Sequence, residues 1–475
     1  MKLQSITIKN YRSIGNVRFD INPVSDGTFT YGLIGVNEAG KSSILQSLAL
    51  LDSHIIPTVL DFQDKALPIE IEYEYVQEKN ELIACKELIA KNYPDLKITD
   101  KDIKNAIFTV SYKSVDLLLV KSLIFREIID ESIKVQLEAL LLDYIFSATH
   151  YTIFWKYAEK YLITDQILLS QFATDPDNIS IPLKRCFELC GYNTNQKIQD
   201  IIQTITTDST EREELRENLG KQVTSLIRKV WPGHPITITF DISGDGINFH
   251  VKDSNKKAKT ASQRSDGFKQ FISFLLNISA QKEVNSLSNS LILLDEPETH
   301  LHPQAQEYFL NELVKLTSSD NNICFFATHS NYMIDKKCLS RNFKVIKRDK
   351  DEKTEVLPFD EKNSTYASVN FEVFGILDDS YHNELYDSLR QKHLDEINKK
   401  LADEKKHETI GINAFDEQFC VQKLKQKKTY PEKNKPNKVT LPTFVRNCIH
   451  YPANKNKDFL SKLKESINLM REYEK

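Results

Sequence analysis

The feature that most constrains this chain is a glycine-rich loop at residues 35–42, which reads Gly-x4-Gly-Lys-Ser. It follows an apolar run at 30–34, predicted to be a strand, and opens a helix predicted over 41–51. In that context the loop amides and the helix N-terminus direct partial positive charge at a phosphate. The loop therefore predicts an α/β domain built around a nucleotide phosphate site.

The residue types in the loop indicate ATP and Mg²⁺ as cofactors. Lys41 would place a cation on the β and γ phosphates, and Ser42 would offer a hydroxyl to magnesium. We expect the other nucleotide contacts of this segment to come from the rest of the loop and the first helical turn: Asn37, Glu38, Ala39, Gly40 and Ser43.

Two further apolar runs end in polar side chains. Residues 291–294 lead into Asp295 and Glu296, and residues 325–328 lead into His329. Parallel strands present such residues at the carboxyl edge of their sheet, where ligands bind. Asp295 would hold magnesium through water, Glu296 would act as general base on the attacking water, and His329 would sense the γ-phosphate.

A fourth segment, Arg264-Ser265-Asp266-Gly267-Phe268, precedes a helix predicted over 269–278. Ser265 and Gly267 would make an anion-binding helix N-terminus. Taken alone, the segment is better explained as an ordinary helix cap.

Hydrophobic periodicity divides the chain into four parts. Residues 1–76 and 235–350 alternate strands and helices, and 77–234 are mainly helical, including the leucine-rich stretch 117–142. Residues 106–112 are a candidate strand within that segment, and 351–475 are predicted to be α-rich. The fold class predicted is α/β, with one domain split by a helical insertion.

The composition excludes few classes of function, but together with the pattern of apolar residues it indicates where the protein is located in the cell. The 475 residues are 40% hydrophobic with a net charge of −4, which neither indicates nor excludes nucleic-acid binding. No apolar run is long enough to cross a bilayer, the first residues do not resemble a secretory signal, and the seven cysteines are scattered. We therefore expect a cytoplasmic protein with reduced thiols and no membrane contact.

Together the motifs resemble the ABC-type P-loop ATPase heads of the RecF, SMC and OLD (overcoming lysogenization defect) group. The resemblance is carried by Ile8–Ile14, Arg264–Gly267, Asp295–Pro303 and His329. It implies an ATPase whose head is split by an insertion.

The resemblance also implies how such heads work together. Two copies would sandwich ATP head to head, with Ser265 and Gly267 of one copy on the γ-phosphate that Lys41 of the other holds. It places Arg12 among the nucleotide contacts and makes Gln63 the candidate for the glutamine that helps to hold the metal. The expected partner is therefore a second copy, in a dimer or a larger homo-oligomer.

The tail points to a partner of another kind. After His329 there is no Glu-Gly element followed by Asp-x-Asp, as a Toprim nuclease domain requires. Residues 366–375, 382–386 and 444–452 resemble stand-alone ATPase subunits of the anti-phage systems Septu and PARIS. That resemblance implies a regulatory or scaffold subunit that controls a separate effector, often a nuclease.

Two alternatives remain open. One is a DNA-repair ATPase acting directly on DNA, although long heptad arms are not visible in the sequence. The other is a self-contained nuclease, because Arg446 and His450 resemble the Arg-x4–6-His motif of HEPN ribonucleases with a shorter spacing. That departure favours packed polar groups at a helix end over a partner-binding surface, and either of these over an RNase site. The lysine-rich stretch 422–438 is either a solvated loop or a phosphate contact, so nucleic acid stays a candidate partner.

Overall fold

The computed structural model describes the chain except residues 52–55, 77–78, 96–106, 116–117, 126–130, 157, 231–235, 253–256, 264–265, 284–287, 349, 360–363, 401–408, 432–436, 452–454, 456 and 475. The chain divides into two compact units, Met1–Asp360 and Glu361–Lys475. Among the described residues, no helix is both long and apolar enough to cross a membrane.

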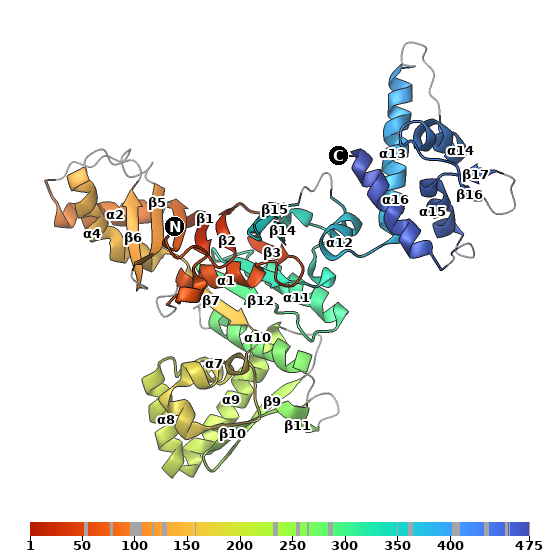
Figure 1. The fold of residues 1–475 in the computed structure, drawn as a ribbon. Helices are drawn as coiled ribbons and strands as arrows, with labels where there is room; N and C mark the ends of the chain where they lie inside the picture. The colour runs from red at the N-terminus through yellow and green to blue at the C-terminus, as the bar shows by residue number, and fades with distance from the viewer. Residues whose placement is uncertain are drawn as a thin grey trace. The chain divides into compact units, whose positions relative to one another are not determined.

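The first unit is organised around a mostly parallel six-stranded sheet in the order β15-β14-β3-β13-β12-β7 (Figure 1). Five strands run parallel and β15 pairs antiparallel with β14. Their bounds are β3 Thr30–Ile34, β7 Tyr151–Lys156, β12 Ser290–Asp295, β13 Ile323–Thr328, β14 Asn342–Lys347 and β15 Thr354–Pro358. The predicted α/β fold class is confirmed.

Each face of this sheet packs into its own core, because successive strand residues point to opposite faces. On one face Leu291, Leu293 and Phe325 pack with α1 (Lys41–Leu48) and with an antiparallel sheet that holds β1, β2 and β4. On the other face Ile292 and Phe326 pack with two helices. The bounds are β1 Lys2–Tyr11, β2 Ile14–Asp20, β4 Glu70–Val76, α10 Asp266–Glu283 and α11 Pro303–Leu316.

The segment 77–234 is less helical than its composition predicts. After α2 (Lys79–Asn92), β5 (Ile107–Val115) and β6 (Leu118–Phe125) extend the antiparallel sheet, and only then does α4 (Glu131–Ala148) begin. The prediction of helix from residue 117 onward was therefore wrong for β6. Full-length pairing with β5 supplies backbone hydrogen bonds that override a leucine-rich composition.

Trp155 is buried on β7, which lies at the end of the parallel sheet beside β12. The rest of 77–234 packs with residues 237–260, which were predicted to belong to the head, into a lobe with its own core, in which helices pack on β9 and β10 (Figure 1). The strands of the lobe are β8 Gln166–Leu168, β9 Thr237–Ser243, β10 Gly246–Lys252 and β11 Ala258–Thr260. Its helices are α5 Leu169–Thr174, α6 Pro176–Ile179, α7 Ile181–Leu189, α8 Asn195–Thr207 and α9 Ser209–Val230.

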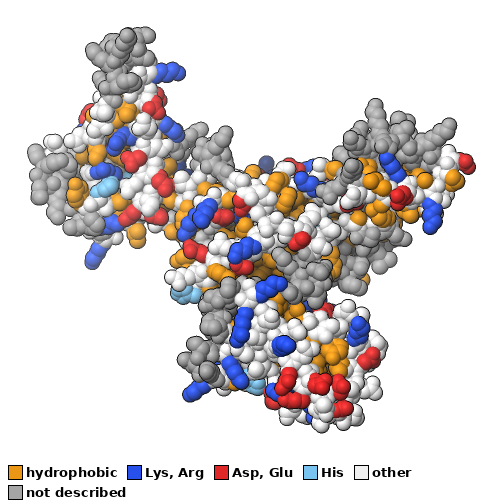
Figure 2. All heavy atoms as spheres, turned by 180° about the vertical axis from the view of Figure 1, so that it is seen from behind, with side chains coloured by type: hydrophobic (Ala, Val, Ile, Leu, Met, Phe, Trp, Pro, Cys, Tyr) orange, Lys and Arg blue, Asp and Glu red, His pale blue; other side chains and the backbone are white. Residues whose placement is uncertain are grey.

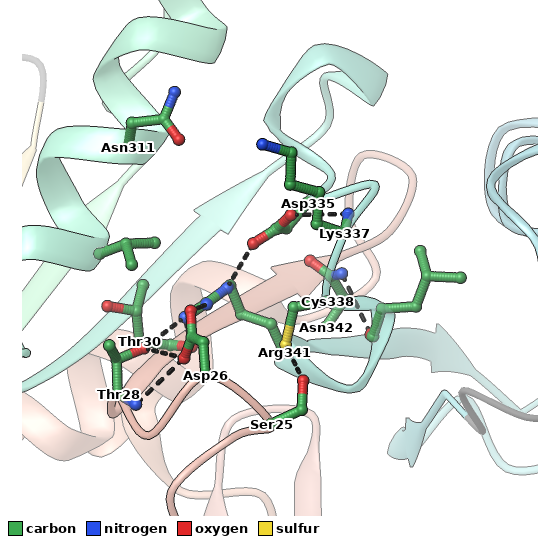
Figure 3. Close-up of polar contacts among 12 residues, drawn as sticks. Ser25, Asp26, Thr28, Thr30, Asn311, Asp335, Lys337, Cys338, Arg341 and Asn342 are labelled. Carbon is green, nitrogen blue, oxygen red and sulfur yellow. Dashed lines mark hydrogen bonds and ion pairs between the residues drawn. The ribbon is translucent and has the colours of Figure 1, made fainter.

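Arg341, which is fully buried, fixes the start of β3 (Figure 3). Its guanidinium donates to the Thr30 carbonyl at 3.1 Å and to Thr28 Oγ1 at 3.0 Å. It also pairs with Asp26, and with Asp335 at 3.0 Å. Burial raises the pKa of Asp26, but the hydrogen bonds from Thr28, together with Arg341, outweigh burial and hold that pKa below its usual value. The strand that delivers the phosphate loop is thus anchored at its start.

The second unit is a helical unit with a separate core that includes Tyr386, Phe415 and Val445. Its helices are α12 Tyr366–Phe374, α13 Asp379–Lys400, α14 Ile412–Phe415, α15 Leu441–His450 and α16 Phe459–Glu474, with a π-helical turn at Asp416–Val421. Two short strands, β16 Tyr430–Pro431 and β17 Lys438–Val439, pair with each other. Arg446 and His450 lie four residues apart on α15, which places them on one side of that helix.

Candidate nucleotide site

The phosphate loop joins β3 to α1 in the geometry that its glycines predict. Gly40 caps the helix at φ 105°, in the left-handed region that glycine adopts readily. Lys41 is buried, and its Nζ donates to the carbonyls of Gly35 and Val36 at 2.9 Å each. Burial lowers the pKa of Lys41, while Glu296, Asp295 and Glu298 act in the opposite direction.

The two halves of the split domain meet at Ser42 and Asp295. Ser42 Oγ donates to Asp295 Oδ1 at 2.8 Å, across 253 residues of sequence. Burial raises the pKa of Asp295, and the hydrogen bond from Ser42 opposes that rise. One hydroxyl beside one carboxylate is a donor set that suits Mg²⁺, which completes its octahedral shell with phosphate and water oxygens.

Glu296 and His329 leave neighbouring strands and meet at the same sheet edge. His329 Nδ1 lies 3.2 Å from Glu296 Oε1, and both side chains are partly exposed. Glu296 has φ 48°, an unusual conformation for a non-glycine residue. Its backbone is held there by bonds from its own N–H to Ala327 O at 3.0 Å and from Thr299 Oγ1 to its carbonyl at 2.9 Å.

Most of the predicted nucleotide contacts line one cavity of about 310 Å³, within the range of small-molecule sites. The lining residues are Arg12, Ser13, Asn37, Glu38, Gly40, Lys41, Ser42, Ser43, Glu296 and Lys347. Asp295 joins this group through Ser42, and His329 joins it through Glu296. Ala39, which also belongs to the loop, is buried in the core that α1 shares with the sheets.

Of the remaining predicted residues, Gln63 and Gly267 are not in the described lining of this cavity. Gln63 is exposed, its backbone N–H donates to Asn10 O at 3.3 Å, and it is not among the residues that line the described cavity. Ser265 lies outside the described residues. Gly267 packs against the segment after Glu296, where a Cβ would lie 2.2 Å from the His300 carbonyl oxygen.

Arg12 reaches the cavity from the turn after β1. It has φ 50°, and its Nε donates to Asp61 Oδ1 at 2.7 Å. A second bond joins Arg12 to Gln46 on α1. These contacts hold the guanidinium beside the phosphate loop.

Sequence reasoning missed a ring of contacts behind Glu296. The Thr328 hydroxyl donates to the buried Glu298 carboxyl, and Ser330 N–H donates to Thr328 Oγ1 at 2.9 Å. Ser330 Oγ donates to Gln306 at 2.5 Å, and Gln306 donates to Leu301 O at 2.8 Å. Leu301 N–H donates to Glu298 O at 2.9 Å, which closes the ring. The ring therefore joins the segment after Glu296 to the segment that carries His329. The sequence signal that could have indicated this ring is Glu298, the second glutamate of Asp-Glu-Pro-Glu.

The Glu298 carboxyl makes stability depend on pH. Burial raises its pKa to about 7 from a usual 4.5, so the folded chain binds a proton there that the unfolded chain releases above 4.5. Stability from this group is complete at low pH and is lost as pH rises through about 7. Glu298→Gln mimics the protonated form and should remove this loss, which is about 3 kcal/mol.

Tryptophan fluorescence measures that difference, because Trp155 and Trp231 are the two tryptophans and both belong to the first unit. Urea midpoints of the wild type and Glu298→Gln at pH 5 and pH 8 should diverge at the higher pH, in favour of the variant. If the midpoints of the wild type and Glu298→Gln differ by the same amount at pH 5 and at pH 8, the Glu298 carboxyl is not buried in its neutral form.

The sequence of residues 1–334 matches the AAA ATPase domain family. The chain belongs to this family. It is an ATPase, as the sequence motifs predict, and the cavity at the phosphate loop is the candidate place for its nucleotide.

Two curated relatives share shorter stretches with this ATPase. The uncharacterized protein MJECL43 of Methanocaldococcus jannaschii is 24% identical over 142 residues, 28% of this chain and 36% of the relative. Protein ea59 of Escherichia phage lambda is 40% identical over 58 residues, 12% of this chain and 11% of the relative. The ATPase thus matches well under two thirds of either relative's length.

Solved structures of SMC heads are loosely similar. An Smc head bound to the C-winged helix domain of ScpA has a TM-score of 0.44 at 13% identity, covering 76% of this chain and 99% of that one. The Smc head bound to the C-terminal domain of ScpA from Pyrococcus furiosus gives 0.42 at 11% identity, covering 76% and 97%. The SMC head domain from Thermotoga maritima gives 0.38 at 11% identity, covering 76% and 100%.

Proposed function

We propose that this ATPase hydrolyses magnesium-bound ATP at the cavity beside the phosphate loop. The observation that carries the proposal is the Ser42–Asp295 hydrogen bond at 2.8 Å, which joins the two motifs that would share the metal. Lys41 and the loop amides would bind the phosphates, and Asp295 would hold the metal through water. Glu296 would accept the proton of the attacking water, with His329 beside it at 3.2 Å.

We further propose that the complete site forms between two copies of the chain. Ser265 and Gly267 of one copy would contact the phosphate that Lys41 of the other binds, as in the ABC-type heads that the motifs resemble. Within one copy Gly267 is buried, and its close approach to the His300 carbonyl seats the start of α10 against the segment after Glu296. A partner head would then meet both segments together.

The proposed role of the assembly is regulation of a separate effector in an anti-phage system. Its support is the resemblance of residues 366–375, 382–386 and 444–452 to stand-alone ATPase subunits of such systems. In this proposal the head holds the two sheets that contain β1 and β3, the lobe with β9 and β10 is the insertion, and the second compact unit is the tail that reports the nucleotide state. The second compact unit, Glu361–Lys475, is the separate body that such a tail requires.

Replacing Lys41 tests the site and the assembly together. Lys41→Ala should reduce ATP affinity below detection by calorimetry, since it removes the buried cation and its bonds to the loop carbonyls. The wild type should gain mass by light scattering when ATP is added, and the variant should not. Lys350→Ala, at an exposed position, is the matched control. ATP binding by Lys41→Ala equal to the control would contradict the proposed site.

The effector needs its own experiment. Co-expression with the product of the neighbouring gene should yield a complex whose nuclease activity depends on Lys41. The purified ATPase should leave RNA and DNA intact with metal and ATP. Cleavage by the ATPase alone, abolished by Arg446→Ala, would favour the self-contained nuclease instead. On the face drawn in Figure 2, Lys and Arg side chains are scattered among acidic and uncharged ones. This face therefore does not by itself indicate a DNA-binding surface, and DNA binding is measured in the same experiment.

A further inference from the structure

The hairpin of β14 and β15 contacts the phosphate loop from a distant part of the chain. Thr354, at the start of β15 and 4% exposed, lies 315 residues beyond Ala39. Its Oγ1 bonds to the Ala39 carbonyl at 3.2 Å and to Ser13 Oγ at 2.7 Å, and its N–H donates to Ser13 O at 2.8 Å. Thr354 thus joins the phosphate loop to the turn that carries Arg12.

The direction of these bonds follows from the number of protons. The Thr354 hydroxyl has one hydrogen, which it donates to the Ala39 carbonyl, so the hydroxyl of Ser13 donates to Thr354. A side chain at position 40 would exclude this contact, because a Cβ there would lie 2.1 Å from Thr354 Oγ1. The glycine is required both for its φ of 105° and for the approach of Thr354.

Holding that carbonyl also orients the next amide. In a planar trans peptide the C=O and the following N–H point in opposite directions. Since the Ala39 carbonyl is turned toward β15, the Gly40 N–H is turned away from it. Gly40, Lys41 and Ser42 all line the cavity, so the Gly40 amide would add a donor for a phosphate oxygen bound there.

The same hairpin supplies a cation. Lys347 on β14 is directly opposite Thr354 in the antiparallel register, and such pairs project from the same face of a sheet. Lys347 is exposed and lines the cavity together with Arg12 and Lys41. A hydroxyl that shapes the loop and an ammonium group therefore reach the site from one cross-strand pair.

We propose that the β14–β15 hairpin is a phosphate-recognition element of the nucleotide site. Thr354 is a positioning residue that orients the Ala39–Gly40 peptide toward the phosphate. Lys347 binds a phosphate oxygen of the nucleoside triphosphate. This inference rests on the proposed function, in which the cavity binds ATP.

Steady-state kinetics on the full chain test the hydroxyl. Thr354→Val keeps the shape of the side chain and should raise KM for ATP about tenfold with kcat within about twofold. Thr354→Ser keeps the hydroxyl and should restore KM. A wild-type KM in Thr354→Val, or a KM in Thr354→Ser as high as in Thr354→Val, would overturn the positioning role.

The charge is tested separately by calorimetry with ATP. Lys347→Met should weaken binding about tenfold and make affinity fall less steeply with added salt. Lys350→Met, at the turn of the same hairpin, should behave as the wild type. If Thr354→Val does not fold, Lys347→Met decides, because wild-type affinity in this surface variant overturns the proposal. A wild-type chain that fails to bind ATP would instead overturn the proposed function.

Discussion

Glu296→Gln should lower the rate of ATP hydrolysis about a thousandfold while ATP stays bound. The amide cannot accept the proton of the attacking water, whereas Lys41 and the Ser42–Asp295 pair are unchanged. Because hydrolysis would release the two copies, the variant should also accumulate as the ATP-bound assembly. Phosphate release measures the rate, and light scattering with ATP measures the assembly.

A matched carboxylate provides the control for that result. Glu307 on α11 is exposed and pairs with Lys336 at 3.1 Å. Glu307→Gln should hydrolyse ATP at the wild-type rate. Turnover in Glu296→Gln equal to that of Glu307→Gln would remove Glu296 as the general base.

Arg341→Ala should destabilise the first unit by about 3–5 kcal/mol, the cost of breaking a buried ion pair from one side. Asp335 and Asp26 would lose their cation, and the Thr30 carbonyl would lose its donor (Figure 3). Urea unfolding followed by tryptophan fluorescence measures the effect, because both tryptophans belong to this unit.

An exposed arginine pair shows what burial contributes. Arg348 pairs with Asp351 at 2.7 Å, with side chains 49% and 36% exposed. Arg348→Ala should cost less than about 1 kcal/mol. Equal losses in Arg341→Ala and Arg348→Ala would show that the buried network does not stabilise this unit. Arg341→Lys should fall between them, because an ammonium group cannot reproduce the planar set of donors.

Local motifs in the sequence predict several elements of the fold and of the candidate site. The phosphate loop lies between an apolar strand and a helix, so its structure depends on neighbours in sequence, and β3 and α1 appear where the pattern predicts. The two strand-end motifs are also local, because β12 and β13 are apolar runs that lead directly into Asp295, Glu296 and His329. Their roles in ATP hydrolysis stay predictions for the variants above to test.

The tertiary structure decided what depends on pairing between distant segments. Leucine-rich β6 is a strand because β5 lies beside it, and β7 joins the parallel sheet through β12. Backbone hydrogen bonds form these pairs whatever the side chains are, so composition does not reveal them. Gln63 was placed by resemblance, and in the structure its side chain is exposed and is not in the described lining of the cavity.

The α/β ATPase domain follows from the amino-acid sequence alone, because the phosphate loop and the two strand-end motifs are each short, uninterrupted and chemically specific. Only the tertiary structure brought Lys347 and Thr354 to that loop. Neither residue stands in a motif, since a lysine and a threonine acquire this meaning only because β14 pairs with β3, which brings Thr354 to Ala39 across 315 residues of sequence. The phosphate loop is a local sequence motif, whereas the residues of the β14–β15 hairpin reach it only through pairing between distant strands.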